Sequence, residues 1–362
     1  MQAATTTPVA DEILRDYEKK APVWFRWVAT LVEHFFTIVM FVTLYGRYLW
    51  SKFVQKQKPV SFRNDTVLIT GAGGCLGRAL AIEFAKECKC LVLLDIQKKP
   101  LDDLKHELTT IYGKDHIKIS THKCDLSDLN GLKFTLTAIR EDVGTITVLV
   151  NCAGVACFKE LLHHTDDEIQ HTLIVNTVAP ILLTKDLLGD MIARNHGHII
   201  NITSSAGLSG SAYTSSYSAS KAALTSKLLF KLHICILTIL TFRLDFTETI
   251  NQELILAKAN GVRATAVMPF HIDGGVYNSL RKFGKETVLG NELMRFDYCA
   301  RQIMCGLKSH QNPILLPRFA LRMMFILRSI LPEEVWHPLL IYILGRPAIK
   351  HEQHNSLLSK VE

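Results

Sequence analysis

A tyrosine and a lysine four residues apart, Tyr217 and Lys221, form the pair best suited to acid–base chemistry. Residues four apart lie on one face of an α-helix, so the ammonium group would lie beside the phenol. A neighbouring positive charge favours the phenolate and lowers the pKa of tyrosine from its usual value of about 10. Tyr217 could then transfer a proton to or from an alcohol oxygen. Ser204, at the end of an expected strand, could hydrogen-bond the same oxygen.

A glycine-rich turn, TGAGGCLG at residues 70–77, follows the apolar run Val67–Ile69 and precedes a helical pattern. Glycines let the backbone approach a pyrophosphate, which then binds N–H groups at the helix N-terminus. Cysteine stands at one position where glycine is expected. We expect the turn to bind a dinucleotide with some loss of affinity, and replacement of that cysteine by glycine to tighten binding. The expected contacts are Gly71, Gly73, Cys75, Leu76 and Gly77.

An acid ends the second strand pattern, where LVLLD closes on Asp95. A carboxylate at this place can accept hydrogen bonds from the adenosine ribose and would repel a 2′-phosphate. The sequence therefore favours NAD over NADP as the cofactor. Lys98 and Lys99 follow closely and would soften that preference.

Short runs rich in β-branched residues alternate with helical patterns from residue 64 onward. Apolar strands separated by helices predict a doubly wound parallel α/β sheet of about seven strands. The expected helices include Gly77–Glu87, Leu101–Tyr112, Asp167–Arg194 and one starting at Tyr217. The expected strands are Thr66–Thr70, Cys90–Asp95, Ile117–Lys123, Thr147–Asn151, His198–Thr203, Arg263–Met268 and Pro313–Leu316.

The N-terminal region, residues 1–60, contains an apolar run, Trp27–Tyr45, that we expect to be a membrane-anchor helix. Its length just suffices to cross a bilayer core of about 30 Å. Glu33 would cost about 3 kcal/mol at mid-membrane, so a helix lying in the interface is an alternative. A buried amphipathic helix is a third possibility. Basic residues follow the run without acids, which slightly favours a main domain facing the cytosol.

Composition excludes several other classes of protein. The formal net charge of +7 is spread along the chain, so we expect no nucleic-acid partner. Nine cysteines without a CxxC pair indicate free thiols in a reducing compartment. Two histidine groups, His163–His164 with His171 and His196 with His198, have no acid or cysteine completing a ligand set, so we expect no metal.

The turn, the acid and the tyrosine–lysine pair occur in an order that resembles the short-chain dehydrogenase/reductase family, from about Asn64 to Leu316. The resemblance implies a Rossmann-like fold and a catalytic tetrad of Asn176, Ser204, Tyr217 and Lys221. By analogy Tyr217 is the acid/base and Ser204 orients the substrate. Lys221 tunes Tyr217 and holds the cofactor ribose, and Asn176 holds a proton-relay water. Further cofactor contacts implied by the resemblance are Asp125, Asn151, Tyr217, Lys221 and Pro269.

The N-terminal run and the phrases HIINITSSAGLSG and LLPRFALRMMFILRSILP resemble a membrane-bound subgroup of that family. This subgroup contains retinol dehydrogenases and 17β-hydroxysteroid dehydrogenases of the endoplasmic reticulum and lipid droplets. The resemblance implies a lipophilic substrate and a similar location, with the catalytic domain facing the cytosol. It also implies a dimer face on the helix carrying Tyr217, which leaves a homodimer open. The basic, apolar C-terminal region, residues 317–362, could cap a lipid pocket, lie on the membrane or pack in the core.

Two departures from the family pattern follow the tyrosine–lysine pair. Gly274 stands where the family usually has a threonine that contacts the cofactor, and residues 227–245, KLLFKLHICILTILTFRLD, interrupt an otherwise continuous helical pattern. This segment could be a second membrane span, a helical extension or surface hairpin, or a translated non-coding stretch. We favour the last, because its removal restores the helical pattern. If the segment is real, the site could be distorted.

The sequence predicts three regions: the anchor (1–60), a catalytic domain (61–316) and the C-terminal segment (317–362). We expect a membrane-anchored oxidoreductase that interconverts an alcohol and a carbonyl on a retinoid, steroid or long-chain alcohol. The alternatives are a non-catalytic membrane or lipid-droplet protein with the same fold, and an NADP-dependent carbonyl reductase.

Overall fold

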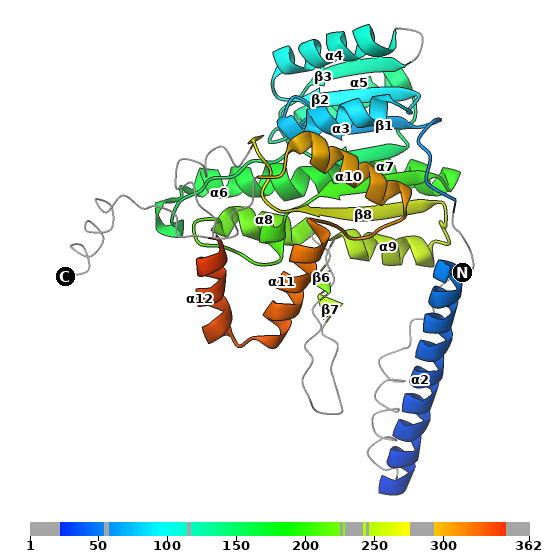
Figure 1. Ribbon diagram of the computed structural model, residues 1–362. Helices are drawn as coiled ribbons and strands as arrows, with labels where there is room; N and C mark the ends of the chain where they lie inside the picture. Colours follow the sequence, from blue (N-terminus) through cyan, green and yellow to red (C-terminus); the bar gives the residue numbers. More distant parts are fainter. Residues whose placement is uncertain are drawn as a thin grey trace, which may run out of the picture. The chain divides into compact units, whose positions relative to one another are not determined.

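Seven parallel strands form the central sheet of the computed structural model (Figure 1), in the order β3-β2-β1-β4-β5-β8-β9. The structure describes residues 22–53, 58–113, 117–224, 227–228, 242–243, 246–275 and 293–344. The predicted doubly wound sheet is confirmed. Its strands are β1 (Thr66–Thr70), β2 (Cys90–Asp95), β3 (Lys118–Lys123), β4 (Val148–Asn151), β5 (Gly197–Ile202), β8 (Val262–Pro269) and β9 (Ile314–Leu316).

The inner strands are buried on both faces, which explains why they appear in the sequence as unbroken apolar runs. Every residue of β1, β4 and β5 is buried. Strand β3 lies at an edge of the sheet, and its two terminal lysines, Lys118 and Lys123, are exposed. Strand order reverses between β1 and β4, so the carboxyl ends of these two strands flank the crevice where doubly wound folds bind ligands.

Helices cover both faces of the sheet (Figure 1). One core cluster joins β1 to α3 (Cys75–Ala85), α4 (Lys98–Tyr112) and α10 (Phe296–Lys308). The other cluster joins β1, β2 and β4 to α5 (Leu129–Val143), α7 (Ala179–Arg194) and α9 (Phe246–Leu256). The helix that carries Tyr217 and Lys221, α8 (Ser215–Leu224), packs against α6 (Asp166–Leu173) and the turn η3 (Ser205–Gly207).

The helix expected at Asp167–Arg194 is interrupted, because a π-helical turn, η2 (Ile174–Val178), separates α6 from α7. A capping box starts α6: Thr165 and Glu168 satisfy each other's backbone N–H groups. Residues 166–194 are also the one helical stretch, among the residues the structure describes, that is long and apolar enough to cross a membrane. Leu183, Leu187 and Met191 of this stretch are buried in the core, as in an internal helix.

The N-terminal unit, Met1–Pro59, contains one described helix, α2 (Val23–Phe53). This helix includes the whole predicted run Trp27–Tyr45 and spans about 46 Å at 1.5 Å per residue. Large apolar side chains are exposed along it, with Leu31, Phe35 and Val42 each more than 60% exposed. The large apolar side chains that the structure describes on α2 thus face away from the other residues of this unit's helix.

The anomalous segment starts and ends as an antiparallel ribbon, in which β6 (Lys227–Leu228) pairs with β7 (Phe242–Arg243). These described ends agree with the surface-hairpin interpretation. Residues 229–241 lie outside the described part of the chain, so the membrane-span alternative falls there. The non-coding interpretation is a property of the transcript and stays a prediction.

The two helices beside this ribbon keep the register of one helix. Thr247, at the start of α9, donates a hydrogen bond of 2.8 Å from Oγ1 to the Leu224 carbonyl at the end of α8. Without residues 227–245, Leu224 and Thr247 would be four residues apart, the spacing of this same bond inside a helix. The Asn201 side chain of β5 also donates to Thr247 Oγ1 at 3.0 Å, and this bond holds Thr247 against the sheet. The bond from Thr247 to Leu224 therefore joins the end of α8 to the start of α9 at the spacing found within one helix.

Two C-terminal helices, α11 (Arg318–Ile330) and α12 (Glu333–Leu344), follow β9. Leu321, Trp336 and Leu340 are buried, so part of this segment packs on the core as one alternative predicted. Phe319 and Ile330 are exposed by 77% and 61% and leave an apolar stripe on α11. The segment thus has both a packed and an exposed apolar face.

We expect deletion of residues 227–245 to leave the midpoint of thermal unfolding unchanged within about 3 °C or to raise it. The reason is that the Thr247–Leu224 bond already holds the two helices in continuous register. Circular dichroism against temperature measures this. As a control, Thr247→Val should destabilise the full chain and the deletion variant alike. Loss of cooperative unfolding in the deletion variant would show that the segment is part of the fold.

Candidate active site

A cavity of about 380 Å³ lies at the carboxyl ends of β1, β2, β4 and β5. This volume is within the usual range for a ligand pocket. The structure brings most of the predicted residues to its wall, but Gly73, Asn151 and Asn176 lie behind it. The predicted residues that line the cavity are Gly71, Cys75, Leu76, Gly77, Asp95, Asp125, Ser204, Tyr217, Lys221 and Pro269.

Two glycines of the turn have no room for a side chain. A Cβ on Gly71 would lie 2.7 Å from Cα of Ala153, and the φ of Gly71 is +68°. A Cβ on Gly77 would lie 2.0 Å from the carbonyl oxygen of Gly71. The turn therefore packs closely against the loop after β4. Helix α3 begins within the turn at Cys75, and the N–H groups of its first turn have no partner inside the helix, as at any anion-binding helix N-terminus.

One carboxylate oxygen of Asp95 holds this turn, and the other holds the start of α4. The Gly73 N–H donates to Oδ2 at 3.0 Å, and the Gln97 N–H donates to Oδ1 at 2.9 Å. The carboxylate is half-buried and faces the cavity. Asp95 thus places a negative charge where the sequence predicts the adenosine ribose, and it also holds the shape of the turn.

Asp125 follows β3 and lines the same end of the cavity. Its Oδ1 accepts hydrogen bonds from the Ser127 hydroxyl and N–H, at 2.7 and 2.8 Å. These bonds lower the pKa of Asp125, so the carboxylate stays charged. Its predicted role is therefore compatible with recognition of a polar group and not with proton transfer.

Tyr217 and Lys221 lie together on α8, and both are at least 95% buried. The Lys221 Nζ lies 5.9 Å from the centre of the Tyr217 ring and donates to the Ile202 carbonyl at 3.0 Å. Burial lowers the pKa of Lys221 to about 8, against a smaller opposing effect of Cys152. The Lys221 amine therefore lies inside the cavity as the four-residue spacing predicted, and burial there disfavours its charged form.

Ser204 stands at the end of β5, where its Oγ accepts a hydrogen bond of 3.2 Å from the Ala206 N–H. The side chain is buried and lines the cavity with Tyr217. Two hydroxyl groups from different elements therefore face one volume, as binding of a single alcohol or carbonyl oxygen requires.

Asn176 lies in the π-helical turn η2 and is fully buried. Its side chain accepts from the Val155 N–H and donates to the Val155 carbonyl, both at 2.8 Å. It also donates to Ser220 Oγ at 2.9 Å. In this structure Asn176 therefore ties the loop after β4 to α8, one residue from Lys221, and its predicted relay role stays a prediction.

Asn151 is placed behind the cavity, at the end of β4, where it donates to Asn201 Oδ1 at 2.8 Å. The pattern analysis did not single out Thr70, whose Oγ1 accepts from the Cys152 and Ala153 N–H groups at 3.1 and 3.2 Å. Thr70 thus connects the glycine-rich turn to the loop after β4. A threonine as the first residue of the glycine-rich turn was the sequence feature that could have predicted this contact.

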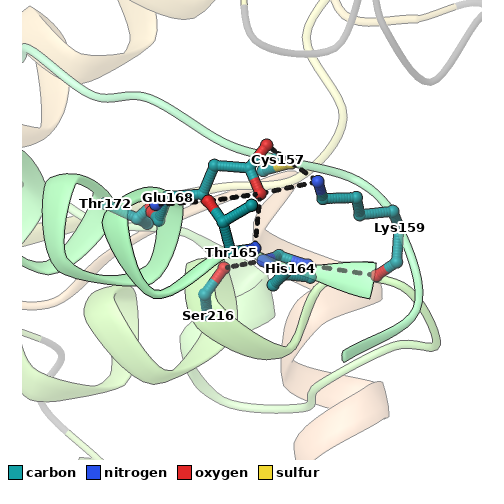
Figure 2. A network of polar contacts seen from close by, with 7 residues as sticks. All are labelled: Cys157, Lys159, His164, Thr165, Glu168, Thr172 and Ser216. Carbon is teal, nitrogen blue, oxygen red and sulfur yellow. Dashed lines mark hydrogen bonds and ion pairs between the residues drawn. The ribbon is translucent and has the colours of Figure 1, made fainter. Parts of the chain in front are cut away.

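A polar cluster that the sequence did not predict holds the loop between β4 and α6 (Figure 2). Cys157, His164 and Glu168 place ligand-type atoms within 4.8 Å of one another. This corrects the expectation that no acid or cysteine accompanies His163 and His164, because the loop folds back onto α6. Lys159 Nζ lies 2.6 Å from Glu168 Oε2, and this bond lowers the pKa of Glu168 to about 2. The Lys159 ammonium group therefore occupies the position beside Glu168 in which a bound metal ion would otherwise balance the charge of the carboxylate.

Burial, followed by the charge of Glu168, raises the pKa of the Cys157 thiol, which disfavours the thiolate that a metal would need. The His164 Nε2 lies 3.2 Å from the Lys159 carbonyl, and its Nδ1 lies 3.5 Å from Ser216 Oγ (Figure 2). Ser216 precedes Tyr217 on α8. The cluster therefore acts as a brace between the loop and the helix of the tyrosine–lysine pair.

Comparison with known proteins decides the family. The short chain dehydrogenase family matches residues 65–229. Retinol dehydrogenase 10 of Homo sapiens is 31% identical over 324 residues, covering 82% of this chain and 89% of that protein. This chain belongs to the short-chain dehydrogenase/reductase family. Retinol dehydrogenase 10-B of Danio rerio is 30% identical and covers 78% of this chain and 83% of that protein. The protein is thus an oxidoreductase of alcohol or carbonyl groups.

Solved structures agree on the fold. A short-chain dehydrogenase/reductase of Burkholderia phymatum in complex with NAD has a TM-score of 0.60 at 21% identity, covering 80% of this chain and 99% of that one. A short-chain dehydrogenase of Sphingobium yanoikuyae in complex with NADPH has a TM-score of 0.58 at 24% identity, covering 74% and 97%. The residues present fit a dinucleotide, since glycines at positions 71 and 77 let the turn pack closely and Asp95 lines the same cavity.

We expect Glu168→Gln to loosen the brace, because it removes the ion pair with Lys159 and weakens the capping box. The KM for substrate should rise by no more than about fivefold, as for an exposed ion pair, while the affinity for cofactor stays unchanged. Steady-state kinetics and a cofactor titration measure the two effects. Asp167→Asn, which removes the same charge from the same helical turn, is the control and should change neither. If the affinity for cofactor fell by a larger factor than the KM for substrate rose, the proposed link between the loop and α8 would be contradicted.

Proposed function

We propose that the protein is an NAD-dependent dehydrogenase that interconverts an alcohol and a carbonyl on a lipophilic substrate at a membrane. One observation carries the proposal: the tyrosine–lysine pair and Ser204 share a single cavity with the glycine-rich turn and Asp95. A dinucleotide held by the turn and the acid would extend toward Tyr217. The site thus joins a cofactor-binding end to a proton-transfer end.

The proton chemistry follows from the residues themselves. Tyr217 would take the hydroxyl proton during alcohol oxidation and return it during carbonyl reduction. Lys221, buried beside the ring, would stabilise the phenolate, because opposite charges attract strongly in a buried site. Ser204 would hydrogen-bond the same oxygen and orient it. Bound NAD would supply the hydride acceptor, and the protein's contribution is orientation and a proton path.

Asp95 supports NAD as the cofactor. Its carboxylate lies at the cavity wall and keeps both oxygens in hydrogen bonds to backbone N–H groups. A 2′-phosphate beside it would be repelled. The rival proposal, an NADP-dependent carbonyl reductase, rests on Lys98 and Lys99, which begin α4 just beyond the acid.

A second, small cavity of about 30 Å³ adjoins Tyr217, and its wall mixes serine, threonine and histidine side chains with apolar ones. Tyr217 lies in the wall of both cavities, and Met324 of α11 and Leu340 of α12 line the second one. Phe158 and Phe270 add aromatic surface. This volume holds little more than one water molecule, so a retinoid, steroid or long-chain alcohol would have to displace these side chains. The similarity to retinol dehydrogenases supports the same class of substrate.

Membrane association is proposed from the exposed apolar side chains of two helices, α2 and α11. On α11, Arg318 and Arg322 are exposed near the apolar stripe, as in helices that lie in a bilayer interface. The endoplasmic reticulum or a lipid droplet, with the catalytic domain facing the cytosol, is the corresponding location. A homodimer stays a prediction.

A non-catalytic protein with the same fold is the second candidate function. The ribbon at 227–245 begins six residues after Lys221 and favours this alternative, because a displaced α8 would separate the catalytic pair from Ser204. Against it stands the bond from Thr247 to Leu224, which keeps α8 aligned with α9.

We expect Tyr217→Phe to lower kcat at least about 100-fold, because it removes the proton donor and acceptor from the site. NADH formation on a mixed panel of retinoid, steroid and long-chain alcohols measures this. Tyr213→Phe, on the turn before α8 and outside the lining of the cavity, is the control and should retain full activity. Absence of activity in the full chain and also in the 227–245 deletion variant would favour the non-catalytic alternative.

We expect Asp95→Asn to shift the ratio of NAD to NADP affinity toward NADP by about tenfold or more, since it removes the charge that repels a 2′-phosphate. Titrations with each dinucleotide give the two dissociation constants. Asp102→Asn removes an exposed charge from the neighbouring helix α4 and serves as the control. An unchanged ratio in Asp95→Asn would favour the carbonyl reductase.

A further inference from the structure

Two residues that depart from the family pattern, Cys75 and Gly274, lie opposite each other in the structure. A Cβ built on Gly274 would lie 3.1 Å from Sγ of Cys75 and 3.6 Å from its Cβ. Cys75 is the first residue of α3, whereas Gly274 belongs to the loop after β8. Cys75 and Gly275 line the same cavity. The thiol therefore fills the space between the glycine-rich turn and this loop.

The loop cannot easily move away from the thiol, because it is tied to a neighbouring segment. Asp273 N–H donates to the Met294 carbonyl at 2.9 Å, and Met294 N–H donates to the His271 carbonyl at 3.2 Å. Ile272 also forms a parallel bridge with Met294. In addition, the φ of Gly274 is +120°, a conformation that side chains rarely adopt. The backbone therefore favours glycine at position 274, and a side chain there would also require the Cys75 sulfur to shift by a few tenths of an ångström.

We propose that Cys75 and Gly274 act as a complementary pair, in which the Cys75 side chain replaces the one missing at position 274 and sets the width of the cofactor cavity. This inference rests on the proposed dinucleotide site. Cys75 is accordingly a positioning residue, since it acts through the spacing of the turn and the loop. The expectation that Cys75→Gly tightens NAD binding is reversed, because removal of the thiol leaves a gap between these two segments.

A double-mutant cycle tests the pair. Gly274→Ala should weaken NAD binding in the natural chain for two reasons: the new methyl group would press on the Cys75 sulfur, and the backbone at a φ of +120° would be strained. In the Cys75→Gly background only the strain remains, so the loss should be smaller by about fivefold or more. Cys75→Ser, which keeps nearly the same volume, should bind NAD like the natural chain. Titration of the purified full-length variants with NAD measures each dissociation constant.

Gly275→Ala is the matched control. Its φ is also positive, at +60°, but no atom lies within 4 Å of the Cβ it would carry. It should therefore weaken binding equally with and without the thiol. Adenosine, which probes only the Asp95 end, should bind all variants equally, whereas general damage to the fold would lower its affinity as well.

The pair would be overturned if Gly274→Ala lowered NAD affinity equally in the natural chain and in the Cys75→Gly variant. It would also be overturned if Gly275→Ala showed the same dependence on residue 75. The thermal unfolding midpoints of the same variants without cofactor give a second cycle. There too Gly274→Ala should cost less after removal of the thiol. If no variant binds NAD and the unfolding cycle shows this coupling, the pair stands and the dinucleotide site fails. Absence of coupling in unfolding and binding alike rejects the pair.

Discussion

The buried ammonium group of Lys221 places the strictest demand on this structure. A charge inside a protein is costly unless its surroundings are fixed and polar, and Lys221 is 4% exposed beside the Tyr217 ring. Its bond to the Ile202 carbonyl requires α8 to stay fixed against the end of β5. Three contacts hold α8 there: Asn176 with Ser220, Thr177 with the Ser220 carbonyl, and Thr247 with the Leu224 carbonyl. The geometry of the site depends on this fixed helix.

The same contacts explain how the chain accommodates an unusual segment directly after the catalytic helix. The ribbon leaves after Leu224, beyond the bonds to Ser220, and its two ends pair with each other as β6 and β7. The bond from Thr247 to the Leu224 carbonyl keeps the start of α9 beside the end of α8 on either side of this segment.

Local patterns were sufficient for the sheet and for the residues that line the cavity. β1 and β2 agree with their predicted limits, and the other strands agree within one residue, because buried apolar runs are local signals. Contacts between distant segments were not predictable. The π-helical turn at Asn176, the cluster of Cys157 with Glu168, and the approach of Cys75 to Gly274 all depend on how loops fold back. A single sequence contains no periodic signal for such pairs.

The central claim is that Tyr217 and the dinucleotide site form one catalytic centre that moves hydride from the carbinol carbon of a lipophilic alcohol. The most direct test supplies the full-length protein with NAD and alcohols carrying deuterium at that carbon, and follows the label by mass spectrometry. The account predicts deuterium in the reduced nicotinamide, with slower turnover than for the unlabelled alcohols. Reduced cofactor without the label, or no reduced cofactor with any of these alcohols, would contradict it.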